Sequence, residues 1–458
     1  MEKDERLLNK IQNCFAQQEG VDDLLRMSEH WDGYKRENAV RRLGMLGNPI
    51  AIPSLLVRAN DWVSQVRDAA MDALRMLMLD ENAQAFIDSL PALYHLAKCR
   101  RSDHGRLIAN VVRFLLQPEN VALVKAAIDS DDKNVARLCV RLCIDHSLIE
   151  GSLLVSRTLQ HSDVIVRTMA CGVLRDLSGE ALESALQKAI QDPFMPIRRE
   201  AFQMCLRTLP GKGPEIARRF VFDKHHSIRE LAIMQLLKSG TDVEALFGEI
   251  LSSSGHSALK VRCALLGVAH LGAKRSIPLV EKHVDDGLPG IRRAALQALA
   301  KLAGEDARAY LVAGLRDPSP GVARESVVLL RKITASPPVD DLLDVFGRAK
   351  YPHTLDVCVR CARLMNKWDR LLFLLTLGER LMSGDRGGVE MLSEELARWD
   401  VDFNRSSAQP SDTQKKAIWA KFRGCAFLLD EQRRRSIEFT VAGFGRELRH
   451  KESQERAR

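Results

Sequence analysis

One ten-residue stretch decides the fold: Asp192-Pro193-Phe194-Met195-Pro196-Ile197-Arg198-Arg199-Glu200-Ala201. The aspartate and proline start a turn, a β-branched residue and an arginine stand five and six positions later, and a small residue follows three positions after that arginine. Close copies of this pattern return along the chain at a nearly fixed interval of 31 residues. Self-similarity at such a period indicates a repeat protein.

The arginine position, which we call the slot, aligns the units. It is occupied by Arg36, Arg67, Arg106, Ala136, Arg167, Arg198, Arg229, Arg262, Arg292, Ala323 and Thr354. The residue before the slot is usually β-branched, a small residue stands at +3 in most units, and apolar residues stand at +7 and +10. On a helix these positions form one stripe. A shorter apolar stretch precedes each turn, so the unit is predicted to be helix, turn, helix.

This unit resembles the HEAT repeat, and in particular the short bacterial-type variety that is also found in phycobilisome lyases. The consensus of that variety runs aspartate-proline-x-x-x-valine-arginine-x-x-alanine, which residues 192–201 match almost throughout. The resemblance covers about residues 29–364 and implies an all-α, right-handed α-α superhelix, a HEAT-like solenoid. It implies little about chemistry, because the family includes scaffolds, lyases, hydroxylases and nucleic-acid enzymes.

The period and the composition divide the chain into six expected segments. These are an N-terminal helical cap (1–28), an array of about ten to eleven repeats (29–364), a helical extension without the period (365–403), a polar linker (404–411), a C-terminal helical segment (412–445) and a charged tail expected to be disordered (446–458).

Composition predicts the environment of the chain. There is no apolar run of 18 residues, and the N-terminus has no signal-peptide layout, so we expect a soluble, cytoplasmic protein that is a monomer on its own. Most of the ten cysteines occupy apolar positions of the repeat, which predicts buried thiols rather than disulfides. Cys358-x-x-Cys361 falls in the middle of a helix and lacks a second pair, so the same interpretation holds for it.

Catalytic motifs are missing from the sequence. It contains no glycine-rich phosphate loop, no Gly-x-Ser-x-Gly elbow and no His-Glu-x-x-His. None of the 12 histidines is followed by glutamate, which argues against the histidine-glutamate di-iron centre of deoxyhypusine hydroxylases in this superfamily. We expect His225 and His226 to be solvated on a turn. The sequence therefore predicts no catalytic residue, no metal site and no cofactor.

The aspartate six residues before the slot and the arginine in the slot recur from unit to unit, which favours a structural role. We expect the aspartate to accept hydrogen bonds from backbone amides of the turn, and the arginine to pair with it or with the next unit. The residues predicted to form this ladder are Asp61, Arg67, Asp192, Arg198, Asp223, Arg229, Asp286 and Arg292.

Opposite the apolar stripe, positions +1, +5 and +8 of the second helix are expected to line the concave surface of a HEAT-type solenoid. These positions are partly acidic in the first two units and rich in arginine from the fourth unit onward, with apolar residues between them. The predicted partner-binding residues are Arg137, Arg141, Arg175, Arg199, Arg293, Arg324, Arg331, Met234 and Leu237.

A surface that mixes arginine with apolar side chains suits an acidic, partly apolar protein partner. The sequence thus favours a non-catalytic, protein-binding scaffold. A nucleic-acid-binding groove is the alternative, permitted by the net charge of +8, although 68 Lys and Arg are nearly balanced by 60 Asp and Glu. The basic positions also lack interleaved aromatics, and we expect Trp31 and Trp62 to pack within the N-terminal units. A phycobilin-lyase-like enzyme is a further alternative, because the repeat type is shared.

Overall fold

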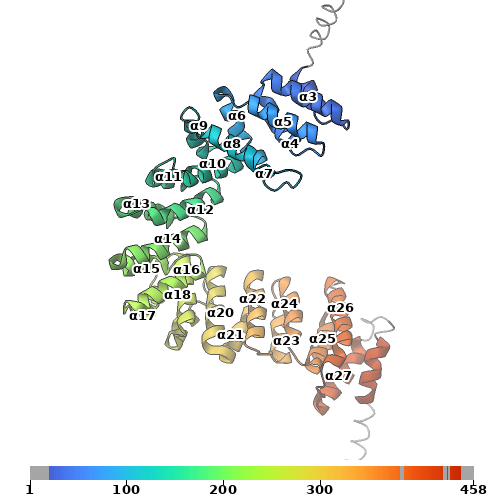
Figure 1. The fold of residues 1–458 in the computed structure, drawn as a ribbon. Helices are drawn as coiled ribbons and strands as arrows, with labels where there is room; N and C mark the ends of the chain where they lie inside the picture. The colour runs from blue at the N-terminus through green and yellow to red at the C-terminus, as the bar shows by residue number, and fades with distance from the viewer. Residues whose placement is uncertain (1–19, 382–385, 426–430, 432–433, 445–458) are drawn as a thin grey trace, which may run out of the picture. The chain divides into compact units, whose positions relative to one another are not determined.

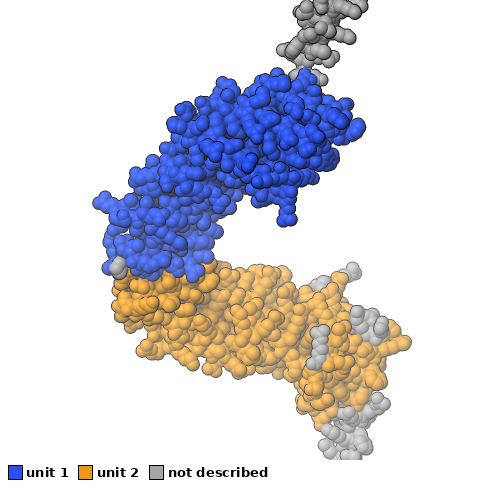
Figure 2. Space-filling model, in the orientation of Figure 1, with its two compact units in different colours: residues 1–212 blue, residues 213–458 orange. Residues whose placement is uncertain are grey.

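The computed structural model describes residues 20–381, 386–425, 431 and 434–444. Residues 1–19 of the predicted cap and the predicted tail 446–458 lie outside the described residues. Within the described part the chain is helical and has no strand, and short helical pairs follow one another along it (Figure 1). The prediction of an all-α, HEAT-like solenoid is confirmed. The contacts divide the chain into two compact units, residues 1–212 and 213–458 (Figure 2).

Unit 1 contains six helical pairs in its described part. The first helices are α2 (Val21–Met27), α4 (Ile52–Arg58), α6 (Ala83–Asp88) with α7 (Leu90–Leu96), α9 (Val121–Ala126), α11 (Gly151–Thr158) and α13 (Gly179–Ala189). The second helices are α3 (Gly33–Leu46), α5 (Ser64–Met76), α8 (Gly105–Leu115), α10 (Lys133–Asp145), α12 (Val164–Val173) and α14 (Met195–Thr208). Helix α2, within the stretch predicted as a cap, packs against α3 as the first helix of a pair.

Unit 2 continues the pattern and ends in longer helices. Its first helices are α15 (Gly213–Phe220), α17 (Val243–Ser252), α19 (Ile277–Glu281), α21 (Arg308–Gly314) and α23 (Val339–Gly347). Its second helices are α16 (His226–Lys238), α18 (Ala258–Leu271), α20 (Pro289–Ala303), α22 (Pro320–Lys332) and α24 (His353–Ala362). Helices α25 (Lys367–Leu381), α26 (Arg386–Asp402) and α27 (Asp412–Cys425) follow, and residues 434–444 are also helical.

Short 3₁₀ turns join many of these helices. They are η1 (Pro49–Ala51), η2 (Asp80–Asn82), η3 (Ala127–Asp129), η4 (Leu174–Asp176), η5 (Pro210–Lys212), η6 (Lys274–Ser276), η7 (Gly304–Ala307) and η8 (Phe403–Arg405).

The second helices begin where the sequence pattern places the turn. The Asp163 carboxylate accepts from the amides of Ile165 and Val166 and so caps α12. Helix α14 instead carries a proline in its first turn, where the missing N–H costs nothing. Gly272 ends α18 in the left-handed conformation that glycine adopts without strain. Local sequence therefore sets both ends of these helices.

The core lies between the two helices of each pair and between neighbouring pairs. The small residues at +3 are completely buried in most units, as at Ala201, Ala232 and Ala295. Small side chains there let helices approach closely: a Cβ added at Gly44 would lie 2.6 Å from the Cβ of Ala73 on the next second helix. Cys139, Cys143, Cys358 and Cys361 are buried as apolar side chains, as the sequence predicts.

The third unit departs from the predicted register. Ala109, aligned to the small position, is exposed, whereas Leu107, Val111 and Leu115 of α8 are buried. The buried stripe therefore places the slot at Ile108 and not at Arg106. The cause is a longer connection before α8, in which His104 is buried and its Nε2 lies 3.3 Å from the side-chain oxygen of Asn60.

The expected packing of Trp31 and Trp62 is wrong, since their side chains are 82% and 68% exposed. Both stand in the turn before a second helix, at the fifth residue before the slot. The slot arginine binds the backbone carbonyl of that residue: Arg36 donates to the oxygen of Trp31 at 2.9 Å, and Arg67 to the oxygen of Trp62 at 3.2 Å. With the carbonyl held by the ladder, the side chain projects from the turn.

The C-terminal helices pack on the last repeat and on one another. Helix α25 contacts α23 and α24 on one side and α26 and α27 on the other. Its Trp368 packs edge-to-face with Trp399 and with Phe403. Glu395, 3% exposed, accepts hydrogen bonds from Arg363, Arg370 and Arg398. The segment after residue 364 thus continues the helical packing without the 31-residue pattern.

Candidate functional site

The turns carry a repeated network of aspartate and arginine bonds. Each turn aspartate accepts from the amide two residues later, as Asp192 does from Phe194 at 2.7 Å. The slot arginine then reaches the aspartate of the following pair, 25 residues away. The pairs described are Arg36–Asp61, Arg167–Asp192 and Arg292–Asp317, with shortest distances of 2.8, 2.8 and 2.7 Å. The side chains of these pairs are at most 12% exposed, so the ladder satisfies charges that are largely shielded from water.

The same arginines also bind their own turn. A terminal nitrogen of the guanidinium donates to the backbone carbonyl of the turn aspartate. It also donates to the backbone carbonyl of the next residue. Arg67, Arg198, Arg229 and Arg292 donate in this way to the carbonyls of Asp61, Asp192, Asp223 and Asp286, at 2.8 to 2.9 Å. Each of the eight residues expected in the ladder therefore makes ladder bonds.

Arg137 lies in the ladder and not on the exposed face where the sequence placed it. Its unit has Ala136 in the slot, and Arg137 pairs with Asp163 through two bonds of 2.6 and 2.9 Å. The hydrogen bond from Arg137 is the main cause that lowers the pKa of the Asp163 carboxyl well below its ordinary value. The guanidinium of Arg137 is thus already paired inside unit 1, with its side chain 26% exposed.

The ladder also controls the ionisation of Asp61. Burial by itself would raise the pKa of this carboxyl, but hydrogen bonds from Arg36 and from the amide of Val63, together with the charges of Arg36 and Arg58, outweigh burial and lower it. The aspartate is thus held as a carboxylate among buried arginines, which suits a structural role.

The remaining predicted contact residues lie on the surface of the second helices. Arg141 and Arg199 of unit 1, and Arg293, Arg324 and Arg331 of unit 2, are exposed. Arg175 is exposed as well and pairs with Glu200 at 2.9 Å. Met234 and Leu237 on α16 are 53% and 51% exposed. We call the exposed surface of the second helices the second-helix face.

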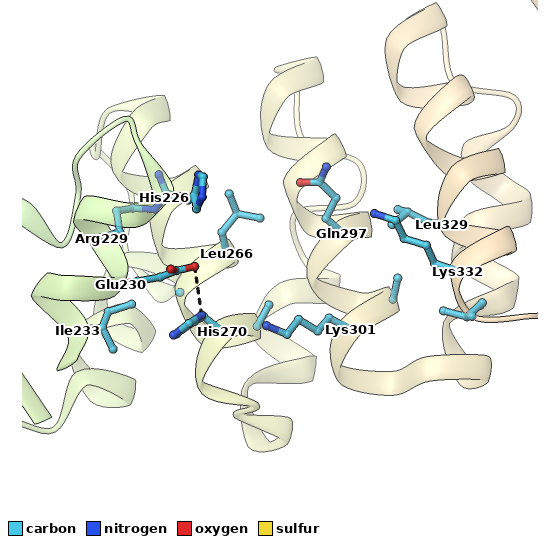
Figure 3. Close-up of a pocket in the computed structure, with 14 residues that line it drawn as sticks. His226, Arg229, Glu230, Ile233, Leu266, His270, Gln297, Lys301, Leu329 and Lys332 are labelled. Atoms are coloured by element: carbon cyan, nitrogen blue, oxygen red, sulfur yellow. Dashed lines mark ion pairs between the residues drawn. The ribbon is translucent and has the colours of Figure 1, made fainter. Parts of the chain in front are cut away.

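In unit 2 this face contains a groove of about 520 Å³ across α16, α18, α20 and α22 (Figure 3). We call it the α16–α22 groove. Its floor is apolar, and its rim is polar. The floor residues are Ile233, Leu266, Gly267, Ala269, Ala300, Leu329 and Ile333. The polar lining residues are His226, Arg229, Glu230, His270, Gln297, Lys301 and Lys332.

The charge of the groove is positive. Glu230 is the one carboxylate in its lining, and it lies 3.8 Å from the Nδ1 of His270 (Figure 3). The guanidinium of Arg229 is tied to the carbonyls of its own turn. Lys301 and Lys332 are exposed and make no ion pair within the described residues. These two ammonium groups are therefore free to meet an anionic ligand.

A second group of cations lies beside the groove, on α22 and α24. A hollow of about 230 Å³ is lined by Arg324, Val327, Val328, Arg331, Arg360 and Arg363. Arg360 pairs with Asp356 at 2.8 Å, and Arg363 pairs with the buried Glu395. Arg324 and Arg331 make no such pair within the described part of the chain, so they extend the free positive charge along α22.

Sequence reasoning missed the two lysines of the groove. It considered positions +1, +5 and +8, whereas Lys301 and Lys332 both stand at +9 from their slots. His270 does stand at +8, but it was not counted among the cations. The signal was present at position +9, which holds Met45 and Met76 in the first two units and lysine in three later ones, Lys238, Lys301 and Lys332.

No group of three or more His, Cys, Asp or Glu side chains that could hold a metal ion occurs among the described residues. No helix of the described chain is long and apolar enough to cross a membrane.

Comparisons with known proteins agree with the repeat geometry. Residues 244–331, which contain α18, α20 and most of the α16–α22 groove, match the family model of HEAT repeats. The chain contains HEAT repeats. The turn ladder of the matched repeats recurs in repeats outside that range, as at Arg36–Asp61 and Arg167–Asp192. No curated protein matches the sequence.

Solved structures with similar helical repeats include three of different kinds. The complex of CpcE and CpcF of phycocyanin lyase from Nostoc sp. is 17% identical, with 61% of this chain and 94% of that chain covered and a TM-score of 0.22. Importin beta is 13% identical, with coverages of 89% and 61% and a TM-score of 0.30. An engineered protein is 16% identical, with coverages of 93% and 98% and a TM-score of 0.18. Such distant likenesses concern the repeat fold, and we draw nothing from them about activity or partners.

Proposed function

We propose that these HEAT repeats form a non-catalytic, protein-binding scaffold, and that the α16–α22 groove holds an acidic, partly apolar segment of a partner. The observation that carries the proposal is the combination in one groove of an apolar floor with two lysines that have no carboxylate partner in the part of the chain that the structure describes. The floor takes apolar side chains away from water, and Lys301 and Lys332 meet carboxylates.

The shape of the groove favours a helical or extended segment over a small molecule. The groove is open, and it crosses four successive second helices, so a ligand can lie across the repeats. An amphipathic segment would place its apolar side on Ile233, Leu266 and Leu329 and its acidic side toward the lysines. Arg293, Arg324 and Arg331 are available to more distant carboxylates of the same partner.

We include in the proposal the earlier predicted contacts that are exposed. Met234 and Leu237 lie on α16, the helix that opens the groove, and offer apolar surface beside it. In unit 1, Arg141, Arg175 and Arg199 are available for contacts on its own second-helix face, with Arg175 shared with Glu200. Arg137 is withdrawn because its guanidinium is bound to Asp163.

The test combines crosslinking with a matched pair of charge variants. A photocrosslinking amino acid at Gln297, inside the groove, captures the partner from a nuclease-treated lysate. Capture is then repeated with Lys301→Glu/Lys332→Glu and with Lys274→Glu/Lys282→Glu. The second pair changes the charge equally, on exposed lysines next to the first helix α19 and outside the groove lining.

We expect a discrete protein whose crosslinked peptide is rich in Asp and Glu, with capture reduced about tenfold or more by the groove variant alone, because its rim charges then repel the partner. Equal loss in both variants would show a non-specific charge effect. If instead a partner is captured only from a lysate that has not been treated with nuclease, and the purified chain binds an oligonucleotide with a steep salt dependence, the groove is a nucleic-acid site and the proposal is wrong.

A further inference from the structure

Four arginines line one small hollow in unit 2, beside the α16–α22 groove. The hollow of about 230 Å³ lies between α22 and α24, which pack against each other. We call it the arginine hollow. Its lining consists of Arg324, Val327, Val328, Arg331, Arg360 and Arg363. Among the described residues, neither a lysine nor a carboxylate takes part in this lining, whereas the groove holds two lysines and Glu230.

Helical spacing brings these four side chains to one place. Arg324 and Arg331 stand seven positions apart on α22, which is two helical turns, so they lie on the same side of that helix. Arg360 and Arg363 stand three positions apart on α24 and share a side of it. Because α22 and α24 are the second helices of successive repeats, the two pairs line a common space (Figure 1).

The hollow carries uncompensated positive charge. On α24, Arg360 pairs with Asp356 at 2.8 Å, and the Nε of Arg363 donates to Glu395 at 3.0 Å. The two arginines on α22 are exposed and have no ion pair within the part of the chain that the structure describes. Two of the four guanidinium charges are therefore matched by a carboxylate, and two are not.

We propose that the arginine hollow binds the phosphate group of a phosphorylated residue on a protein partner. A phosphate monoester carries a charge of about −1.5 to −2 at pH 7 and offers three acceptor oxygens. This charge matches the two uncompensated guanidinium groups, whereas a single carboxylate supplies one charge and two oxygens. Arginine also presents a planar fork of donors that binds phosphate through paired hydrogen bonds, which a lysine cannot do.

The hollow continues the α16–α22 groove. Lys332 of the groove and Arg331 of the hollow are neighbours at the end of α22. A segment whose acidic, partly apolar part lies in the groove would reach the hollow with its next residues. The phosphate and that segment belong to one partner, so this site rests on the proposed function.

The surroundings of the hollow favour a single phosphate over the backbone of a nucleic acid. Beyond α24, the surface toward α26 is lined by Asp356, Glu390, Glu394 and Glu395 as well as by arginines. A nucleic-acid strand carries a phosphate at each nucleotide and requires a basic track along its path. The carboxylates of α26 interrupt such a track, but a phosphopeptide needs only one phosphate position.

The test measures peptide binding to the full chain. Degenerate peptide libraries, long enough to cover the groove and the hollow, carry phosphoserine, phosphotyrosine, serine or glutamate at one fixed position. They are passed over the immobilised chain, and the enriched sequences are then made as labelled peptides whose affinities are measured by fluorescence anisotropy.

Two double variants are compared with the wild type. Arg324→Gln/Arg331→Gln removes the two uncompensated guanidinium groups. Arg218→Gln/Arg219→Gln is the matched control, because it removes the same charge from exposed residues of α15 that line neither the hollow nor the groove.

We expect phosphopeptides to be enriched and to bind about tenfold or more tightly than the same sequences with serine or glutamate. Arg324→Gln/Arg331→Gln should abolish this difference, and the control variant should keep it. Equal affinity with and without phosphate, or an equal loss in both variants, would overturn the inference. Inorganic phosphate or an oligonucleotide that binds as tightly as the best phosphopeptide would also overturn it, since the hollow would then take a free anion or a nucleic-acid backbone.

Failure of the proposed function gives a different result. Lys301→Glu/Lys332→Glu should weaken the phosphorylated and the serine peptides by the same factor, because it changes the groove and leaves the arginines of the hollow in place. If it weakens neither, the groove is not the site of the acidic segment. If the serine peptides bind the groove but phosphate adds nothing, the proposed function holds and the inference about the hollow is wrong.

Discussion

Changing Arg292 to methionine tests the claim that the ladder holds the repeats together. Arg292 is 8% exposed and donates two bonds of 2.7 Å to the carboxylate of Asp317, and two more to the carbonyls of Asp286 and Gly287. Methionine keeps most of the aliphatic volume but removes all four bonds. The substitution therefore leaves the buried carboxylate of Asp317, which also accepts from the amide of Ser319, without its cation.

The expected loss in the free energy of unfolding follows from these contacts. A hydrogen bond to a charged group contributes about 1.5–3 kcal/mol, and removing one partner of a buried ion pair costs about 3–5 kcal/mol because the other charge stays buried. We expect Arg292→Met to lower the free energy of unfolding by about that amount. The neighbouring Arg293 is exposed and unpaired within the described residues, so Arg293→Met should cost less than about 0.5 kcal/mol.

Urea unfolding followed by circular dichroism measures the loss, and hydrogen exchange of peptides from residues 286–332 shows whether it is local to this repeat. In the double variant Arg292→Met/Asp317→Asn no charge remains buried, and asparagine can still cap the turn. We therefore expect it to be more stable than Arg292→Met alone. The reasoning is refuted if Arg292→Met lowers the free energy of unfolding no more than Arg293→Met does. It is also refuted if Asp317→Asn destabilises the Arg292→Met variant as much as it destabilises the wild type.

Three further predictions concern other contacts. Gly267→Ala should destabilise unit 2 by about 1–3 kcal/mol in urea unfolding, since an added Cβ would lie 2.3 Å from the Phe247 ring; an unchanged midpoint would show that the ring yields freely. The pKa of Asp163 is lowered in the folded chain, so its contribution to stability is present above the unfolded pKa of about 3.9 and is lost as pH falls through the folded pKa. Acid titration of Arg137→Gln should accordingly show a shallower loss of stability below about pH 5 than wild type, and parallel curves would contradict this. Burial raises the pKa of the Cys361 thiol to about 12, so a thiol reagent at neutral pH should modify it only on unfolding; labelling at the rate of an exposed thiol would exclude the packed core around it.

The sequence could predict the repeat architecture because the same stripe of small and apolar residues on the second helix recurs in each repeat. Wherever a small residue stands at +3 between apolar positions, as at Ala201 and Ala295, the structure buries it. The predicted alignment of the third unit is wrong because the connection before α8 is longer. A longer loop changes the distance between successive slots, but it leaves the buried stripe of the helix unchanged. The buried residues Leu107 and Val111 identify the register only once the packing is known.

The candidate site was harder to predict, because a groove is made by neighbours and not by one helix. Lys301 and Lys332 stand at the same repeat position, but each is an ordinary exposed lysine in its own helix. They become a pair only because α20 and α22 pack side by side over an apolar floor. The two exposed tryptophans show the same limit: sequence places Trp31 and Trp62 in equivalent turns, but their exposure depends on how the ladder holds those turns.

A shift of one position along a second helix decides whether an arginine stabilises the fold or lies on the surface. Arg292 and Arg293 are adjacent, yet the first is buried in the ladder and the second is exposed, because one step along a helix turns the side chain by about 100°. At Ala136, where alanine takes the slot, the next arginine enters the ladder in its place, and its aspartate stands 26 residues away instead of 25. After Ala323, by contrast, Arg324 stays exposed. Net charge cannot distinguish such arginines, since a ladder cation is neutralised by its aspartate and a surface cation is not. It follows that exposed charges such as Arg293 at +1 and Lys301 at +9 can change at little cost in stability, whereas a buried ladder arginine such as Arg292 cannot, so the surface can adapt to a partner while the ladder keeps the repeats packed.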